Sequence, residues 1–185
     1  MIATIDSEAR QFAALHPTRD GKTWSMYCGS LMWRMCEAYG VTPVPIPSSA
    51  KLAGDAAGTL NTNSKIAPIG AFHYWTYGAD GHVGLDTKGG GTDVFMASKC
   101  LRESLGDCIG FQSVEGYTRK GDFPYRGWSK NYGKNGIILP PSMSIAMKYW
   151  IDNGVLDSNG DLNRNVDIET LCWFMYKAIG KMQEK

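Results

Sequence analysis

One cysteine in the sequence stands where a thiol can act as a nucleophile. The chain has 185 residues and 5 cysteines, and Cys28 falls in the first turns of a helix predicted between Asp20 and Gly40. Free backbone N–H groups and the positive end of the helix dipole stabilise a thiolate at such a place. The alternative is a structural role, in which Cys28, like Cys36, is a small apolar residue on the buried face of the helix.

Among the 3 histidines, His82 is the best placed to activate that thiol. It begins a predicted strand directly after a tight turn, in the run Gly81-His82-Val83-Gly84, and its small neighbours leave room for a substrate chain. His73 lies mid-strand among aromatic residues, where we expect a hydrogen-bonded structural role, and His16 lies in a predicted surface loop. A helix with a cysteine followed by a sheet with a histidine lets thiol and base meet across the helix–sheet seam. We therefore predict Cys28 as nucleophile and His82 as base.

Along the chain, the predicted elements that position these residues are three helices followed by three strands. Apolar spacing and capping residues predict helices near residues 6–15, 24–36 and 50–57. Strand-forming residues then predict strands at 69–75, 82–87 and 92–97, separated by turns at 78–81 and 88–91. Residues 100–136 are rich in glycine and aromatic residues without a clear period, so we expect mostly loop with short strands. This order predicts an α+β fold with an antiparallel sheet.

A smaller helical module is predicted at the C-terminus. Helical patterns near residues 140–151 and 165–179 divide the chain into a catalytic domain at 1–136 and a C-terminal module at 137–185, too short to be expected to fold alone. The loop at 157–163 has oxygen ligands at alternate positions, as an EF-hand loop does. Leu162 stands where that loop needs glycine and Ile168 where it needs glutamate, so we interpret it as a solvated turn without metal.

Composition excludes several classes of function. The net charge of +1 gives no general attraction to nucleic acid or an anionic membrane. The sequence has no run of about 18 apolar residues and no basic, then apolar, N-terminal stretch, so we expect synthesis in the cytoplasm without a signal peptide and no membrane insertion. The cysteines form no Cys-x-x-Cys pair. We expect a monomer that uses neither a metal nor another cofactor.

The segments that contain Cys28 and His82, and the strand between them, resemble those of a known family. The segment Trp24-Ser25-Met26-Tyr27-Cys28-Gly29, a strand at 67–75 and Gly81-His82-Val83-Gly84 occur in the order found in the NlpC and CHAP groups of papain-like cell-wall peptidases and amidases. The later Tyr125-Arg126-Gly127-Trp128-Ser129 is similar to the segment that closes the catalytic domain of phage lysins of this type. Ile69-Gly70-Ala71 replaces the Pro-Gly-Asp-like sequence common in the first strand.

The resemblance implies a third polar residue that orients the histidine from the following strand. A hairpin that turns about Gly89 and Gly90 places His82 opposite Ala97 or Ser98. Ser98 is then the nearest polar side chain, although a water or a backbone carbonyl could serve instead. We predict a catalytic set of Cys28, His82 and Ser98.

The function implied is hydrolysis of bacterial peptidoglycan by a cysteine endopeptidase or N-acetylmuramoyl-L-alanine amidase, as in a phage endolysin. His82 would take the thiol proton, Cys28 would attack an amide carbonyl, and water would release the acyl-enzyme. Such an enzyme would be made in the host cytoplasm and act at the cell wall. Two alternatives are a cytoplasmic cysteine amidase acting on a small amide and a non-catalytic wall-binding module. Aromatic residues predicted to line a substrate groove are Trp24, Tyr27, Trp75, Tyr77 and Trp128.

Overall fold

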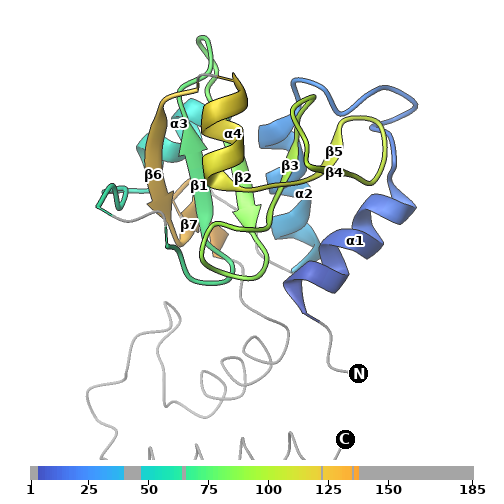
Figure 1. Cartoon of the computed structure of the whole chain (residues 1–185), viewed down its shortest axis with the longest axis horizontal. Helices are drawn as coiled ribbons and strands as arrows, with labels where there is room; N and C mark the ends of the chain where they lie inside the picture. The colour runs from blue at the N-terminus through green and yellow to red at the C-terminus, as the bar shows by residue number, and fades with distance from the viewer. Residues whose placement is uncertain (1–3, 40–46, 64–65, 122, 135, 138–185) are drawn as a thin grey trace, which may run out of the picture. The chain divides into compact units, whose positions relative to one another are not determined.

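A computed structural model of the chain describes residues 4–39, 47–63, 66–121, 123–134 and 136–137. These residues form four helices and two antiparallel sheets (Figure 1). The predicted α+β class is therefore confirmed. The predicted module at 137–185, including Cys172 and the loop at 157–163, lies outside the described residues apart from its first position.

Three helices come before the main sheet. Helix α1, Ile5–Leu15, begins with a capping box in which Thr4 and Ser7 bond each other's backbone and side chain. Helix α2 is Cys28–Ala38, and α3 is Ala50–Ala56, capped by the side chain of Ser49 as its sequence predicts. Helix α2 begins at Cys28, later than the sequence predicts, because Met26 has a φ of 69°, outside the helical region.

The main sheet has the strand order β4-β5-β3-β2-β1-β6, and every neighbouring pair is antiparallel. Strands β1, Phe72–Trp75, β2, His82–Asp86, and β3, Val94–Ala97, form the predicted meander. The remaining strands of this sheet are β4, Glu103–Ser104, β5, Ile109–Gln112, and β6, Tyr125–Ser129. A separate small sheet pairs β7, Asn131–Tyr132, with β8, Gly136–Ile137.

The region from 100 to 136 is more regular than the sequence suggests. Besides short strands it contains helix α4, Val114–Gly121. Ser113 precedes it and accepts a hydrogen bond from the N–H of Gly116 at 3.0 Å, which is the geometry of an N-cap. Glycine at two positions of so short a helix obscures its period, so the capping serine is the signal that could have revealed it.

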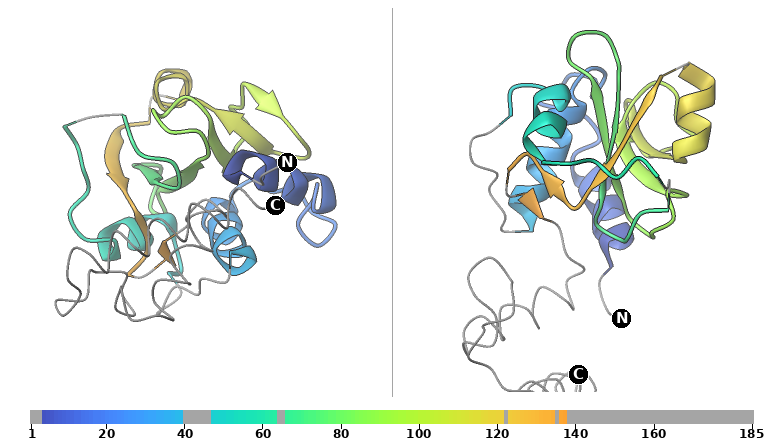
Figure 2. Two further views of the ribbon diagram at one scale, coloured as in Figure 1. Left: turned by 90° about the horizontal axis from the view of Figure 1, so that it is seen from below. Right: turned by 90° about the vertical axis from the view of Figure 1, so that its left-hand side faces the viewer.

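The helices cover the two faces of the sheet unequally. Helices α1, α2 and α3 pack on the face that carries Phe72, Tyr74, Val83 and Leu85. Helix α4 packs on the opposite face with Trp75, Val94 and Met96 (Figure 2, right). Burying each such large side chain contributes about 1.5–3 kcal/mol. Because side chains alternate along a strand, consecutive residues of β2 face different helices.

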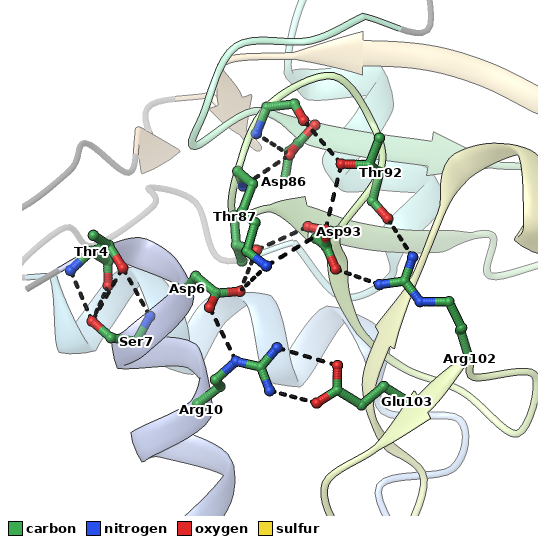
Figure 3. Close-up of polar contacts among 12 residues, drawn as sticks. Thr4, Asp6, Ser7, Arg10, Asp86, Thr87, Thr92, Asp93, Arg102 and Glu103 are labelled. Atoms are coloured by element: carbon green, nitrogen blue, oxygen red, sulfur yellow. Dashed lines mark hydrogen bonds and ion pairs between the residues drawn. The ribbon is translucent and has the colours of Figure 1, made fainter.

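Ion pairs tie α1 to the turn between β2 and β3 and to β4 (Figure 3). The guanidinium of Arg10 bonds Asp6 at 3.1 Å and both carboxylate oxygens of Glu103 at 2.5 and 3.2 Å. Asp6 also accepts a hydrogen bond from Thr87 at 3.3 Å. No helix within the part of the chain described above has the length and apolar character needed to cross a membrane.

Candidate active site

A cleft of about 490 Å³ opens at the end of the main sheet where β2 begins. Its walls come from the loop before α2, the first turn of α2, the cap of α3, the β1–β2 loop, the end of β3 and α4. The cleft brings together the three predicted catalytic residues, which are Cys28, His82 and Ser98. We therefore treat it as the candidate active site.

The thiol of Cys28 lies at the first residue of α2 and is 8% exposed. Burial is the largest influence on this thiol and raises its pKa, and the negative charge of Asp80 acts in the same direction. Hydrogen bonds from the backbone N–H groups of Val83, Gly29 and Cys28 itself oppose that rise. The helix start thus stabilises a thiolate as predicted, but burial outweighs it, so the resting thiol is neutral and needs a base.

The imidazole of His82 lines the same cleft and is in the neutral form that a base needs, although its lowered pKa makes it a weak base. It is 5% exposed, and burial lowers its pKa from 6.5 to about 3, so the ring is neutral at neutral pH. The ring stacks on Tyr117 with a centroid distance of 4.5 Å and an interplanar angle of 24°. Trp75 contacts it from β1 at 5.6 Å. Among the described residues, Nε2 of His82 has no hydrogen-bond partner.

Cys28 and His82 approach the cleft from different faces of the sheet. Val83 and Leu85 point toward α2, whereas His82 points toward Trp75 and Tyr117 on the α4 face. The hydrogen bond from the N–H of Val83 to the thiol brings Sγ to the beginning of β2. Cys28 and His82 therefore line one cleft around the end of this strand.

The backbone on both sides of the pair is firmly held. The hydroxyl of Tyr132 donates to the carbonyl of Gly29 at 2.8 Å, which anchors the first turn of α2. The N–H of Lys51 donates to the carbonyl of Asp80 at 2.7 Å, which anchors the β1–β2 loop on α3. Such support from neighbouring elements keeps a nucleophile and its base in fixed places.

Ser98 lies where the hairpin register predicts, but it bonds other residues. The pairs Leu85–Phe95 and Asp86–Val94, continued along the strands, place His82 opposite Ser98. The side chain of Ser98 hydrogen-bonds the side chain of Tyr117 and accepts from the N–H of Cys100 at 3.0 Å. The contact with the imidazole that we predicted for Ser98 is not among its hydrogen bonds.

The predicted aromatic groove is only partly assembled. Tyr27 and Tyr77 line the cleft, and the hydroxyl of Tyr77 contacts the sulfur of Met26 at 3.9 Å. Trp24 and Trp75 are fully buried, and Trp128 lies in β6, so none of these three lines it. Two aromatic residues that the sequence did not single out, Tyr117 and Phe123, complete the wall.

A second histidine is bonded in the way its sequence position predicts. His73 is fully buried in β1, with Nε2 3.1 Å from Oδ2 of Asp86 and Nδ1 2.7 Å from the hydroxyl of Tyr125. Asp86 also accepts hydrogen bonds from the backbone N–H groups of Lys88, Gly89 and Gly91. This network holds the β2–β3 turn and does not open into the cleft.

The part of the chain covered by the structure contains no group of three or more His, Cys, Asp or Glu side chains that could hold a metal ion. A scan against protein-family models and searches of characterised proteins and of solved structures find no match to this chain. The assignment of function therefore rests on the site itself.

Proposed function

We propose that this chain is a papain-like cysteine hydrolase that cleaves an amide bond of bacterial peptidoglycan, in the manner of a phage endolysin. The observation that carries the proposal is a neutral imidazole and a thiol at a helix start lining one cleft, with the thiol hydrogen-bonded to the residue after the histidine. A cysteine and a base within reach form the minimal machinery of acyl transfer.

The chemistry follows from the protonation states. His82 accepts the proton of the Cys28 thiol as Sγ attacks the amide carbonyl, so no free thiolate need accumulate. The N–H groups at the start of α2 can donate to the oxyanion that forms. The imidazolium then gives its proton to the leaving amine, and a water, deprotonated by His82, hydrolyses the thioester.

The cleft suits an extended peptide carrying both polar and apolar groups. Tyr27 and Met26 stand exposed at its rim, and Asp80 and Lys99 add one charge of each sign to its lining. The stem peptides of a cell wall present carboxylates, amines and alkyl groups in succession, which this mixed lining matches.

Clearing of a suspension of purified cell walls tests the proposal. The parent protein should reduce turbidity and release free amino groups, and Cys28→Ala should abolish both without changing the unfolding temperature appreciably. Cys108→Ala is the matched control, because Cys108 lies outside the cleft and should leave clearing unchanged. Wall clearing by Cys28→Ala at the rate of the parent would refute the proposal.

One observation favours a second candidate function, a wall-binding module without catalysis. Nε2 of His82 lacks the polar partner that usually orients a catalytic imidazole. If neither parent nor Cys28→Ala clears walls but both co-sediment with them, the binding module is the correct assignment.

A further inference from the structure

His82, the base of the proposed enzyme, has no polar partner that orients its ring through the buried nitrogen Nε2. Nε2 of His82 is buried, and no described side chain or backbone group bonds it. A ring held only by its Cβ would rotate about two side-chain torsions and lose the alignment that proton transfer requires. Another contact must therefore fix the ring plane.

The face of Tyr117 provides that contact. Its ring lies against the imidazole at 4.5 Å and 24°, the most nearly parallel of the aromatic contacts that His82 and Tyr117 make. Trp75, whose ring is 57° from the imidazole plane at 5.6 Å, packs against the same histidine from β1. The imidazole is thus confined by two aromatic rings.

Tyr117 is itself immobilised by contacts to three other parts of the domain. Its side chain bonds Ser98 at the end of β3, and its ring meets the edge of Trp75 at 5.0 Å and Phe123 at 4.9 Å. Helix α4 is tied to the β2–β3 loop by a 2.8 Å hydrogen bond between the N–H of Val114 and the carbonyl of Gly91. The ring is therefore a fixed surface rather than a mobile neighbour.

We propose that Tyr117 is the positioning residue of the catalytic base: its ring holds the imidazole of His82 in plane, and Ser98 acts through Tyr117 rather than on His82. The inference rests on the proposed function. During acyl transfer the proton that leaves Sγ of Cys28 makes His82 an imidazolium, and the π face of Tyr117 stabilises that cation until the proton passes to the leaving amine. The ionisable groups that act on Tyr117 are Cys28, Cys100 and Tyr77, and Asp80 acts on Cys28.

The test separates the ring of Tyr117 from its hydroxyl. Tyr117→Phe and Ser98→Ala both remove the hydroxyl–hydroxyl bond, so each should lower kcat by no more than about threefold, and the double variant should lose no more than either alone. Tyr117→Leu removes the ring and should lower kcat about tenfold or more with little change in KM. Tyr77→Leu, which removes a cleft aromatic that does not touch His82, should act mainly on KM.

Two kinetic results would overturn the inference. One is a Ser98→Ala loss at least tenfold greater than that of Tyr117→Phe, because Ser98 would then act directly on the imidazole. The other is a folded Tyr117→Leu protein with kcat within threefold of the parent. If Tyr117→Leu does not fold, Tyr117→Met takes its place as the variant without the ring, and the comparison of Ser98→Ala, Tyr117→Phe and their double variant tests the part of Ser98.

A measurement without substrate distinguishes failure of this inference from failure of the proposed function. The chain has 3 histidines, so the ring resonances of His82 can be followed by NMR in the whole protein. The ring current of Tyr117 should displace them in the parent and in Tyr117→Phe, and the displacement should be lost in Tyr117→Leu. A parent protein that leaves walls intact refutes the function, whereas unchanged His82 resonances in Tyr117→Leu refute the positioning role.

Discussion

The protonation of His82 links the candidate site to the stability of the domain. Its pKa is about 3 in the folded protein and 6.5 in an unfolded chain, so the unfolded state binds a proton first as the pH falls. The stability contributed by the neutral buried ring is present above pH 6.5 and is lost progressively as the pH falls toward 3. Between pH 6.5 and 4.5 this loss should amount to about 2–3 kcal/mol.

Chemical denaturation of the parent and of His82→Gln at several pH values checks this expectation. Glutamine does not titrate, so the free energy of unfolding of the variant should fall less steeply below pH 6.5 than that of the parent. His16→Gln is the matched control for the loss of one histidine, because His16 is exposed and lies outside the cleft. Parallel slopes for the parent and His82→Gln would show that the imidazole is not buried in the neutral form.

Residue types and spacing predicted where Cys28 and His82 lie in the fold but not their surroundings. A cysteine at a helix start and a histidine at a strand start are local features, so Cys28 and His82 could be placed from the sequence. The hairpin register likewise predicted the position of Ser98. Ser98 bonds Tyr117, which lies 19 positions later on α4. The packing of α4 depends on contacts with Trp75 and Gly91, which are distant in sequence. No local sequence pattern therefore predicts the contact between Ser98 and Tyr117.

At the scale of elements, the β1–β2 loop determines the position of His82 at the start of β2. Gly81 has a φ of 69°, and a Cβ added to it would lie 2.9 Å from the backbone nitrogen of Lys51. That nitrogen belongs to the anchor that ties the loop to α3. A side chain at position 81 would therefore push the loop, and His82 with it, away from the start of α2.

Gly81→Ala should consequently lower both stability and activity. The unfavourable φ and the backbone clash together should cost about 2–4 kcal/mol of unfolding free energy. Gly78→Ala is a close control, because Gly78 also has a positive φ, of 51°, but nothing lies within 4 Å of an added Cβ. That variant should lose only about 1 kcal/mol. Equal losses in the two variants, measured by urea denaturation, would mean that the contact with α3 does not constrain the loop.

The elements were predicted unevenly, for a physical reason. Helices α1 and α3 carry side-chain caps, and the meander has strong strand formers between glycine turns, so their local preferences agree with the fold. Helix α4 and the late start of α2 were missed, because they depend on the Ser113 cap amid glycines and on the positive φ of Met26. Both exceptions border the cleft, and they determine which aromatic residues form its wall.

At the scale of the whole molecule, near-neutral charge limits how the chain could hold the wall polymer that we propose as its substrate. With 19 basic and 18 acidic residues, long-range attraction to an anionic polymer is weak, whereas a shaped cleft acts through short-range contacts.

The Cys28→Ala variant allows wall binding to be measured without turnover. Its binding should therefore change by less than about twofold between 0.05 and 0.5 M NaCl, because added salt screens charges without weakening apolar contacts. Co-sedimentation with purified walls measures this, with a strongly basic protein as the salt-sensitive control. If binding falls tenfold over that range of salt concentration, the wall is bound by charge clusters elsewhere on the chain and not by the cleft.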